Sequence, residues 1–582
     1  MQKNEKMEKV RHSLAHLMSM AIMEKKFPQA GLGVGPAIED GFYQDYDLPE
    51  SISEKDFEWI EKRMREMIAQ KIKFIQSEDT FENALKFYQH DPYKTEMIEG
   101  LREKGEKKLS FYDSDWFHNL CAGPHVADTG EINPDAFKLT KVAGAYWRGD
   151  EKNKMLLRIY GVAFETKAEL DAYLNMLAEA EKRDHKKLGK ELDLFCFSEL
   201  VGAGLPMFTP RGTIIREEIS KFLNKLKTAR GYELVDIPHL AKVELYKTSG
   251  HYDKFKNDIF YVKGKSEEFV LKPMNCPHHA QIFTSRPRSY REMPFRYAEI
   301  TKQYRDEQTG ELSGLSRVRS ISIDDTHIFL RPDQIGEEAK RAYEIIEEFY
   351  QPFGIKLDVR LSVRDPEHKE KYLGTDAIWA KAEAGLKEFL KGVGQKFAVD
   401  EGEAAFYGPK IDFKGFDSLG REWQLATIQL DFNLPDRFEL EYTDEKGEKV
   451  RPVMIHIAVA GSLERFMSIL IEHYAGAFPA WLAPVQVELI PVSPEKHGEG
   501  ALKLKQELGD LGVRVEVDDA NETLGNRVRK AIGQKIPYIL AVGDKELGGE
   551  EWMIRIRGVE KQEKMSKEKF VERILGEIKE RK

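Results

Sequence analysis

The sequence of 582 residues contains very little cysteine, with only Cys121, Cys196 and Cys276. Three cysteines cannot form a disulfide framework, which indicates a reducing compartment, so we expect a cytoplasmic protein. The sequence also has no run of about 20 apolar residues, which excludes a membrane-spanning helix. Its charged N-terminal stretch has no apolar segment of the kind found in secretory signals. We therefore expect no membrane association.

An excess of positive charge is also missing. The chain has 90 Lys and Arg against 100 Asp and Glu, a formal net charge of -10, which excludes a non-specific nucleic-acid coat but not a local basic patch. Hydrophobic residues make up 41% and charged residues 33%, which excludes a disordered chain. A chain of this length holds about three to five domains.

Hydrophobic periodicity divides the chain into four parts, which are residues 1–166, 167–191, 192–482 and 483–582. The first part predicts helices over 10–26 and 54–71 and then short strands, which indicates an α+β domain. The second is rich in Ala, Glu, Lys and Leu and predicts one charged linker helix. In the third, strands outnumber helices, which predicts a mostly antiparallel sheet. In the fourth, strands alternate with helices, which indicates a small α/β domain.

The first group of chemically active residues combines histidine with cysteine. His12 and His16 lie four residues apart, which places both rings on one face of the first predicted helix, and Cys121 and His125 follow far downstream. These four side chains can form a zinc site or a hydrolytic pocket with histidine as general base. Taken alone, His12 and His16 are equally well explained as partly buried residues of an amphipathic helix. The scarcity of histidine and cysteine, with 15 and 3 residues, favours a functional cluster.

A second group contains a thiol and two arginines. Cys276 lies beside histidines in the segment KPMNCPHH. Arg305 and Arg317 flank a glycine-containing turn, so that they can grip phosphates or form a solvated charged hairpin.

A third group lies in two apolar segments. Asp324, Asp325 and His327 fall within a predicted strand, where charge is costly unless it is paired or bound to a metal. In HIAVAGSLERF, small residues follow His456 and lead into a helix whose first turn carries Arg465, a guanidinium that can reach a triphosphate.

These segments, in this order, resemble the threonyl-tRNA synthetases, a family of class II aminoacyl-tRNA synthetases. Motif 1 resembles residues 214–238, motif 2 resembles residues 295–329, and motif 3 resembles GSLERF at 461–466. Other family segments are matched by HSLAHLM, CAGPHV, GAYWRGD, KPMNCP, AFYGPKIDF and PAWLAPVQV. The resemblance implies an α+β multidomain protein. Its parts would be an editing domain at 1–166, a linker helix at 167–191, a class II antiparallel-sheet catalytic core at 192–482, and an α/β anticodon-binding domain at 483–582.

The resemblance implies a threonine–tRNA ligase. Such an enzyme activates L-threonine with ATP and Mg²⁺ and transfers it to the 3′ end of tRNA(Thr). Motif 1 of class II enzymes forms a dimer interface, so a homodimer is implied. Most bacterial members begin with a small ubiquitin-like domain, whereas this sequence starts at the editing helix; we expect that domain to be missing either from the protein itself or only from this shortened form of it.

The resemblance also implies one catalytic zinc per chain, held by Cys276, His327 and His456 with an open position for substrate. Zinc that binds the amino group and the hydroxyl of threonine excludes valine, which an apolar pocket separates poorly from threonine. Asp325 resembles the aspartate that accepts a hydrogen bond from that hydroxyl, and Tyr407 resembles a tyrosine that lines the pocket.

For ATP, Arg305 resembles the motif 2 arginine that bridges the substrate carboxylate and the α-phosphate. Glu307 resembles the acid that contacts adenine. Arg317 and Arg465 resemble the arginines that hold the γ-phosphate, and Gln424 resembles a further ATP contact.

Motif 2 departs from the family at two positions. Ile321 stands where the family usually has an aromatic residue that packs on adenine. Loss of this stacking is expected to weaken ATP binding by about 1 kcal/mol. Ile323 stands where the family usually has a glutamine that reaches the threonine carboxylate. Loss of this hydrogen bond is expected to weaken threonine binding by about 1.5–3 kcal/mol. These departures motivate the alternative of a synthetase-like RNA-binding regulator with weakened catalysis. A third hypothesis is an enzyme whose main role is editing in trans. The retained zinc ligands and arginines argue against both.

The first domain resembles the family's editing domain, and the characteristic residues are matched by His12, His16, Cys121 and His125. Serine also carries a hydroxyl, and one methyl is worth only about 1–3 kcal/mol, so a second site has to hydrolyse seryl-tRNA(Thr). Lys94 matches a lysine near the scissile ester. In this family the cluster works without metal, whereas related alanyl editing proteins bind zinc. Asn119 replaces the usual aspartate, and Gln44 replaces the usual tyrosine.

The last part of the chain resembles the anticodon-binding domain that several class II synthetases share. Within it, Asn521, Arg529 and Arg555 are the candidates for contacts with anticodon bases.

Overall fold

The computed structural model describes residues 2–417, 420–549 and 551–582. The chain divides into two compact units, residues 1–178 and 179–582. Within the described ranges, no helix combines the length and the apolar character needed to cross a membrane.

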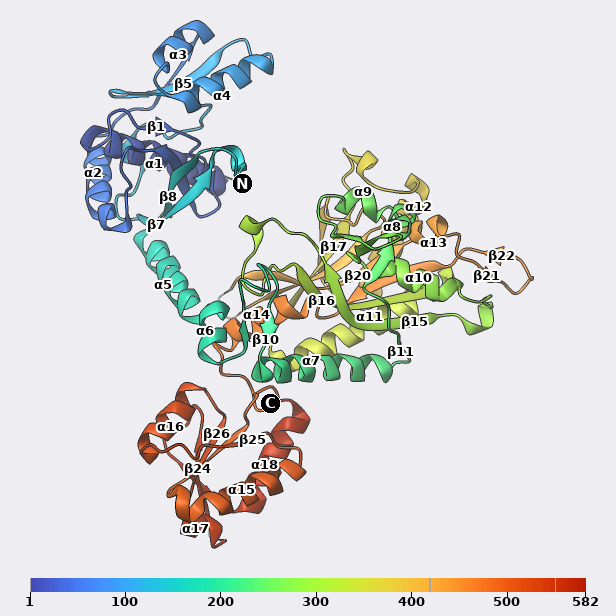
Figure 1. Ribbon diagram of the computed structural model, residues 1–582. Coiled ribbons are helices and arrows are strands. Elements are labelled where there is room, and N and C mark those ends of the chain that lie inside the picture. Colours follow the sequence, from blue (N-terminus) through green and yellow to red (C-terminus); the bar gives the residue numbers. More distant parts are fainter. Residues whose placement is uncertain (1, 418–419, 550) are drawn as a thin grey trace. The chain divides into compact units, whose positions relative to one another are not determined.

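The first unit contains two small sheets with their own helices (Figure 1). The larger sheet is antiparallel, in the order β1-β3-β8-β7 with β2 paired to β3, and its strands are β1 (Gly31–Leu32), β2 (Ala37–Ile38), β3 (Gly41–Asp47), β7 (Phe137–Tyr146) and β8 (Met155–Ala163). Helix α1 (Gln2–Lys25) packs on this sheet and on α2 (Phe57–Ala69). The predicted first helix is therefore confirmed, although it starts eight residues earlier than its apolar pattern indicated.

The smaller sheet of the first unit positions a second set of side chains. Its order is β4-β5-β6, with β4 (Ile75–Asp79), β5 (Leu109–Ser114) and β6 (Phe117–Leu120). Helices α3 (Phe81–Phe87) and α4 (Pro92–Glu103) accompany it, and Figure 1 shows both beside β5. Asp91 caps α4 by accepting hydrogen bonds from the backbone of Tyr93 and Lys94, which fixes the start of the helix that carries Lys94.

The linker differs from the single helix that was predicted. It forms α5 (Lys167–Arg183) and α6 (His185–Glu191), and Asp184 between them accepts a hydrogen bond from the backbone of Lys186. A side-chain carboxylate that caps a new helix competes with continuation of the old one, so the composition was helical but the capping residue introduced a break.

The second unit is built on an eight-stranded sheet in the order β11-β15-β16-β23-β20-β19-β17-β18. Its strands are β11 (Glu233–Leu234), β15 (Phe295–Tyr304), β16 (Ser320–Leu330), β17 (Leu357–Val363), β18 (Phe397–Glu401), β19 (Lys410–Phe416), β20 (Glu422–Asp431) and β23 (Val453–Ala458). Only the terminal pairs β11–β15 and β17–β18 are parallel, so the prediction of a mostly antiparallel sheet is confirmed.

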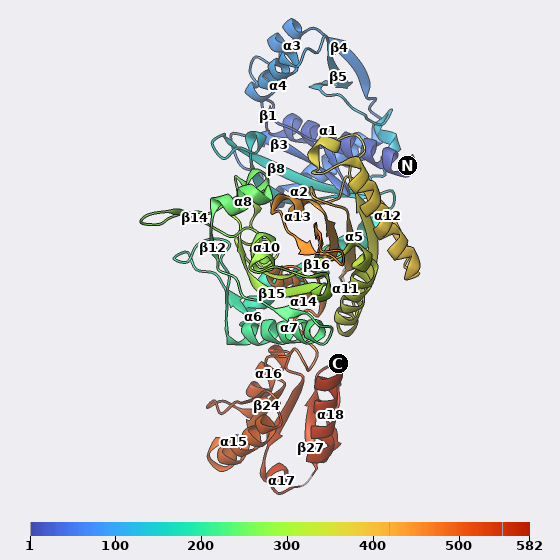
Figure 2. The same cartoon turned by 90° about the vertical axis from the view of Figure 1, so that its right-hand side faces the viewer.

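Helices cover this sheet and complete its core. Figure 2 shows α11 (Ile335–Tyr350) and α12 (Asp376–Gly392), which contact each other and pack against β20 and β17 respectively. Helix α7 (Pro210–Thr228) contributes Ile215, Ile219 and Phe222 to the same core. Helix α14 (Leu463–His473) is capped by Ser462, whose side chain accepts a hydrogen bond from the backbone of Arg465.

A buried ion pair ties these elements together. Lys227, on α7, donates to Asp324 and to Thr326 Oγ1 on β16, the latter at 2.7 Å. The other carboxylate oxygen of Asp324 accepts hydrogen bonds from the backbone of Val459 and Ala460, at 2.9 and 3.0 Å. One carboxylate therefore links α7, β16 and the turn before α14.

We expect Lys227→Met to lower the free energy of unfolding of the second unit by about 3–5 kcal/mol, because Asp324 is left as an unpaired buried charge. Urea denaturation followed by tryptophan fluorescence measures the change. Lys225→Met, at an exposed position of the same helix, is the matched control and should be nearly neutral. Adding Asp324→Asn should recover part of the loss, and equal stability of all three variants would contradict the prediction.

The last part of the chain forms a five-stranded sheet in the order β25-β24-β26-β27-β28. Its elements are β24 (Val487–Pro491), α15 (Pro494–Asp510), β25 (Val515–Val517), α16 (Leu524–Gly533), β26 (Tyr538–Val542), β27 (Trp552–Ile556), β28 (Glu563–Met565) and α18 (Lys567–Glu580). Residues of α15 and α18 pack on one face of the sheet, and residues of α16 pack on the other. The predicted α/β alternation is confirmed.

Candidate functional site

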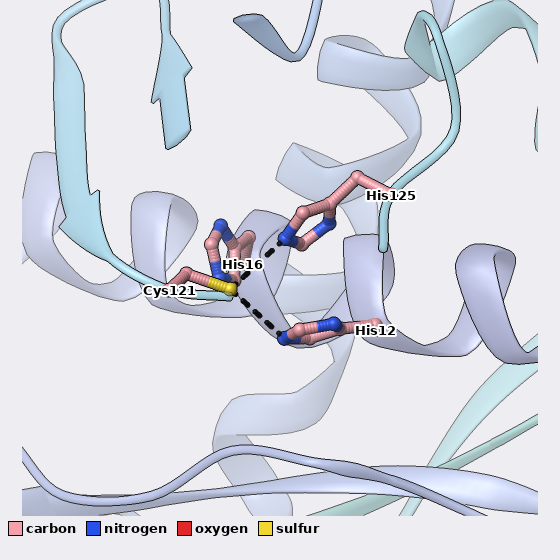
Figure 3. Close-up of side chains that lie close together, drawn as sticks. All are labelled: His12, His16, Cys121 and His125. Atoms are coloured by element: carbon pink, nitrogen blue, oxygen red, sulfur yellow. Dashed lines mark hydrogen bonds between the residues drawn. The ribbon is translucent and has the colours of Figure 1, made fainter. Parts of the chain in front are cut away.

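Three histidines and a cysteine meet between α1 and the loop after β6 (Figure 3). His12 and His16 lie one turn apart on α1, while Cys121 and His125 come from the loop. The Sγ of Cys121 is 3.4 Å from Nε2 of His12 and 3.3 Å from Nε2 of His125. The candidate ligand atoms of all four residues lie within 4.8 Å of one another. The cluster predicted from sequence is therefore assembled.

Burial keeps this cluster uncharged. It lowers the pKa of His12 and of His16, and it lowers the pKa of His125 to about 3. It also raises the pKa of the Cys121 thiol. A neutral imidazole keeps one ring nitrogen that can accept a hydrogen bond or a proton from water, as a general base requires, but its lowered pKa makes it a weaker base than a solvent-exposed histidine.

Lys94 lies next to the cluster. Its Nζ donates to the carbonyl of Leu120 at 3.4 Å, one residue before Cys121. Burial lowers the pKa of Lys94 to about 8. An amine with this pKa is still mostly protonated at neutral pH, so Lys94 can donate a hydrogen bond to an ester oxygen without the full hydration of a surface lysine.

The two departures from the editing pattern have different surroundings. The amide Nδ2 of Asn119 lies 3.2 Å from Nε2 of His16, so this residue contacts the cluster directly. Gln44 is buried on β3, and its amide donates to the carbonyls of Gly33 and Asp45. Gln44 therefore supports the backbone near the site, and Asn119 is the departure that contacts a candidate catalytic group.

A cleft of about 780 Å³ opens beside Cys121. Its lining includes two aromatic, four basic and two acidic residues, of which Arg158 and Asp45 form an ion pair; they are Tyr146, Trp147, Lys104, Lys108, Arg148, Arg158, Asp45 and Glu106. Aromatic faces and cations together suit the bases and phosphates of a single-stranded nucleic acid.

A second cluster combines two neighbouring strands of the eight-stranded sheet with one helix. Cys276 begins helix α10 (Cys276–Thr284), His327 lies on β16, and His456 lies directly opposite His327 on β23. All three residues are buried, and their candidate ligand atoms lie within 4.8 Å of one another. One thiolate and two imidazoles form a donor set that suits zinc and leaves a fourth position open.

Neighbouring side chains orient these three residues. Asp431 lies 2.8 Å from Nε2 of His456, which leaves Nδ1 of that ring for an ion. Nδ1 of His279 lies 2.8 Å from Nδ1 of His327. His251 Nε2 is 3.6 Å from the Sγ of Cys276.

Of these neighbours, the sequence drew attention only to His279, through its place beside Cys276. His251 and Asp431 carried no sequence pattern. Tyr407 joins the same group, because its ring stacks on that of His456 with the centroids 4.9 Å apart.

Asp325 lies beside the cluster and is held by two amides. Nδ2 of Asn275 and Nε2 of Gln303 approach the same carboxylate oxygen at 3.0 and 3.4 Å. The other oxygen lies 3.5 Å from Nε2 of His327. The carboxylate is thus oriented with one oxygen toward the cluster, as acceptance of a substrate hydroxyl requires.

Arg305 follows β15 and is partly buried beside this group. Its guanidinium lies over the ring of Phe255 at 4.9 Å, and among the described residues its Nε has no hydrogen-bond partner. Burial lowers the pKa of Arg305. An unpaired buried guanidinium nitrogen is available for a carboxylate or a phosphate.

Three of the other predicted ATP contacts, which are Glu307, Arg317 and Arg465, lie in or contact the loop between β15 and β16. Arg317 and Glu307 form an ion pair at 2.6 Å, so their separate roles toward phosphate and adenine require this pair to open. Nε of Arg465 donates to the carbonyl of Ser316 at 3.1 Å. Nε2 of Gln424, on β20, donates to Asp412 at 2.8 Å.

The two motif 2 departures lie on β16 on the same face as Asp325. Ile321 faces Gln303 across the β15 ladder, and Ile323 faces Thr301. Both isoleucines are partly exposed, so that a larger or polar side chain at either position has access to the site.

The three anticodon candidates all lie in the last part of the chain but form no cluster. Asn521 lies exposed in the segment before α16, and Arg529 lies exposed on α16. Arg555 pairs in register with Ile539, whose side chain packs with α16. Among the described residues, no hydrogen bond connects the side chains of these three.

Three models of known protein families match segments of this chain. The tRNA synthetase class II core domain (G, H, P, S and T) matches residues 256–474, and the anticodon binding domain matches residues 486–577. The threonyl and alanyl tRNA synthetase second additional domain matches residues 109–160.

Individual relatives are similar over nearly the whole chain. The sequence is 48% identical over 563 residues to a threonine–tRNA ligase of Gloeobacter violaceus, covering 95% of this chain and 89% of the relative. It is 47% identical over 578 residues to that of Staphylococcus carnosus, covering 99% and 89%. A solved structure titled as the RNA binding domain of threonyl-tRNA synthetase from Cryptosporidium parvum has a TM-score of 0.64 at 35% identity, covering 68% of this chain and 98% of the other. A putative threonyl-tRNA synthetase from Aeropyrum pernix has a TM-score of 0.60 at 30% identity, covering 69% and 95%.

Proposed function

The chain belongs to the threonine–tRNA ligase family, and from this we infer its reactions. It activates L-threonine with ATP, transfers threonine to the 3′ end of tRNA(Thr), and hydrolyses seryl-tRNA(Thr) in its first unit. The resemblance, the fold class and the activity predicted from sequence are confirmed. The observation that carries this function is the buried trio of Cys276, His327 and His456 beside Asp325.

We propose that the trio holds one zinc ion per chain. The donor set fits zinc, Asp431 supports His456 from behind, and a dication offsets the charge of a buried thiolate. When bound, zinc supplies a Lewis acid for the amino group and the hydroxyl of threonine. Asp325 then accepts a hydrogen bond from the hydroxyl, and Tyr407 closes the pocket over His456. Valine offers no hydroxyl and leaves these polar groups unsatisfied.

For adenylate formation, we propose that Arg305 binds the threonine carboxylate and the α-phosphate. The nucleophile is the carboxylate oxygen, the bond to pyrophosphate breaks, and Arg305 stabilises the charge between them. Arg317 and Arg465 bind the γ-phosphate, Glu307 and Gln424 contact ATP, and Mg²⁺ accompanies the phosphates.

For editing, we propose that the neutral imidazoles of the first unit activate water. His16 and His125 are buried and His12 is partly buried, all three have a lowered pKa and lie close to Cys121, and Lys94 lies at the same edge. The cleft with its aromatic and basic lining receives the 3′ end of the tRNA.

Assembly, location and tRNA contacts complete the proposal. We propose a homodimer in the cytoplasm, and what supports the dimer is the resemblance of residues 214–238 to motif 1, which forms the interface in class II enzymes. We propose that Asn521, Arg529 and Arg555 contact the anticodon.

The proposed domain boundaries are 1–166, 167–191, 192–482 and 483–582, although the two compact units separate inside α5.

Threonine-dependent ATP–pyrophosphate exchange tests the synthetic function. We expect exchange with threonine, weaker exchange with serine and none with valine. If no exchange occurs at any substrate concentration while tRNA binding persists, the protein is instead an RNA-binding regulator.

Two reciprocal substitutions test the motif 2 departures. We expect Ile321→Phe to lower the KM for ATP about fivefold, because a ring at this position stacks on adenine for about 1 kcal/mol. We expect Ile323→Gln to lower the KM for threonine about tenfold or more, because an amide hydrogen bond to a charged carboxylate is worth about 1.5–3 kcal/mol.

Each variant is the control for the other, because Ile321→Phe should change only the KM for ATP and Ile323→Gln should change only the KM for threonine. Exchange kinetics with one substrate saturating measure both constants. A uniform change in both constants would contradict the assignment.

A further inference from the structure

We propose that His185 is a positioning residue for the ATP site. Its imidazole holds the loop between β15 and β16 in the place where Arg317 and Arg465 meet the phosphates. This inference rests on the proposed synthetase function, because it concerns the ATP that the second unit consumes.

His185 begins α6 and is buried between two partners. Its Nδ1 lies 2.6 Å from Oε1 of Glu472 on α14, and the backbone N–H of Leu315 donates to its Nε2 at 3.0 Å. A backbone N–H can only donate, so Nε2 is the unprotonated nitrogen and Nδ1 carries the proton. The imidazole is therefore neutral and held as a single tautomer.

Glu472 is the fixed end of this arrangement. Its second carboxylate oxygen accepts from Arg421, and its first accepts from both the backbone N–H and the ring of His185. Burial alone opposes ionisation, but the hydrogen bonds from His185 and Arg421 keep the pKa of Glu472 below its usual value. Asp184, His185 and Glu472 also have a geometry that can hold a metal. Both nitrogens of the His185 ring already have hydrogen-bond partners, so we interpret this group as a hydrogen-bonded link between Glu472 and the backbone of Leu315 and not as a metal site.

The loop is shaped to receive the ring. Gly314 has a φ of +49°, and a Cβ at this position would lie 2.2 Å from Nε2 of His185, which no side chain could tolerate. Leu315 is fully buried beside it. Glycine therefore permits the close approach through which the backbone of Leu315 reaches the imidazole.

The anchored residue adjoins the phosphate-binding groups. Arg317 lies two residues after Leu315 in the same loop. Ser316, between them, makes two contacts with α14. Its carbonyl accepts a hydrogen bond from Nε of Arg465 at 3.1 Å, and the Ser316 hydroxyl lies 3.1 Å from the hydroxyl of Ser468. His185 thus fixes the short segment that carries one candidate γ-phosphate arginine and supports the other. Small displacements of such groups are costly because catalysis depends on their placement.

Two variants separate this role from simple packing. In His185→Gln, the longer side chain retains an acceptor near the position of Nε2 for Leu315 but loses the donor near Nδ1. In His185→Asn, the shorter side chain retains a donor near Nδ1 for Glu472 but cannot reach Leu315. Asp184→Ala is the matched control, because it removes the cap of α6 and leaves the ring in place.

We expect His185→Asn to raise the KM for ATP roughly tenfold, because the buried N–H of Leu315 is left without a partner. The KM for threonine should remain unchanged. His185→Gln should keep a KM for ATP close to that of the parent, even if its thermal midpoint falls as much as that of His185→Asn. Asp184→Ala should alter the midpoint only.

The proposal is overturned if both His185 variants raise the KM for ATP equally, or if both substrate constants rise together. ATP binding measured by calorimetry on the full chain gives the same comparison without turnover. An absence of exchange in the parent would refute the proposed function. The calorimetric difference between His185→Asn and His185→Gln would still decide the role of His185.

Discussion

Cys276→Ser is expected to lose its zinc and, with the metal, at least about 100-fold of the threonine-dependent exchange rate. A serine hydroxyl is a poor zinc ligand at neutral pH, whereas the thiolate supplies the one charged donor of the trio. Altered outer partners of a metal ligand already cost 10–100-fold, so loss of the ligand itself should cost more. Elemental analysis and pyrophosphate exchange on the same preparation measure both effects.

The chain provides matched controls, because it has only three cysteines. Cys196→Ser changes an exposed thiol and should retain both zinc and exchange. Cys121→Ser changes the cluster of the first unit and should also retain both. If Cys276→Ser kept stoichiometric zinc while Cys121→Ser lost it, the cluster of His12, His16, Cys121 and His125 would be the metal site, and our division of roles would be wrong.

The trio of Cys276, His327 and His456 shows why sequence patterns alone do not locate such a site. The gaps between these residues are 51 and 129 positions, and no ligand-spacing rule covers them. The β16–β23 register brings His327 and His456 opposite each other, and it forms only when the sheet forms. Family resemblance named these three residues, and the structure brings them together, whereas periodicity could predict only the strands that carry two of them.

Residues with a supporting role were missed for a related reason. His185, His251 and Asp431 stand alone in sequence and find partners 287, 25 and 25 positions away. An isolated histidine or aspartate is compatible with many surface and core environments, so its sequence context contains no information about a distant partner. The pair His12 and His16 could be identified because helical spacing alone puts both rings on one face.

The break in the linker is a smaller example. Alanine, glutamate, lysine and leucine favour a helix throughout 167–191, and this preference was correctly identified. Asp184 nevertheless caps a second helix, which places His185 at the first position of α6 and against Glu472. Composition averages over a window, whereas a cap depends on one side chain.

His12→Ala is expected to lower the rate of seryl-tRNA(Thr) deacylation by about 100- to 10,000-fold, the usual contribution of general acid–base catalysis. The substitution removes the imidazole whose Nε2 lies 3.4 Å from the Sγ of Cys121. Because burial already holds the ring neutral, its loss removes a proton acceptor and not a charge. Deacylation of purified seryl-tRNA(Thr) under single-turnover conditions measures the change.

Two controls define the result. His118→Ala removes a histidine of β6 that pairs with Asp113 outside the cluster, and it should leave deacylation unchanged. Threonine-dependent exchange should also be unchanged in His12→Ala, because His12 and Arg305 belong to different compact units. Mischarged tRNA should therefore accumulate with the variant and not with the parent.

The rate at which the unmodified protein deacylates seryl-tRNA(Thr) decides whether Asn119 is compatible with an active editing pocket. Its amide contacts Nε2 of His16 and carries no charge, whereas the usual aspartate would stabilise a protonated imidazole at that point. If parent and His12→Ala deacylate seryl-tRNA(Thr) equally slowly, the pocket is already disabled, and the first unit acts as a tRNA-docking surface. In that case Asn119→Asp should restore hydrolysis. If the parent is fast and His12→Ala slow, a neutral amide suffices beside His16, because the neighbouring imidazoles can share the proton that water releases.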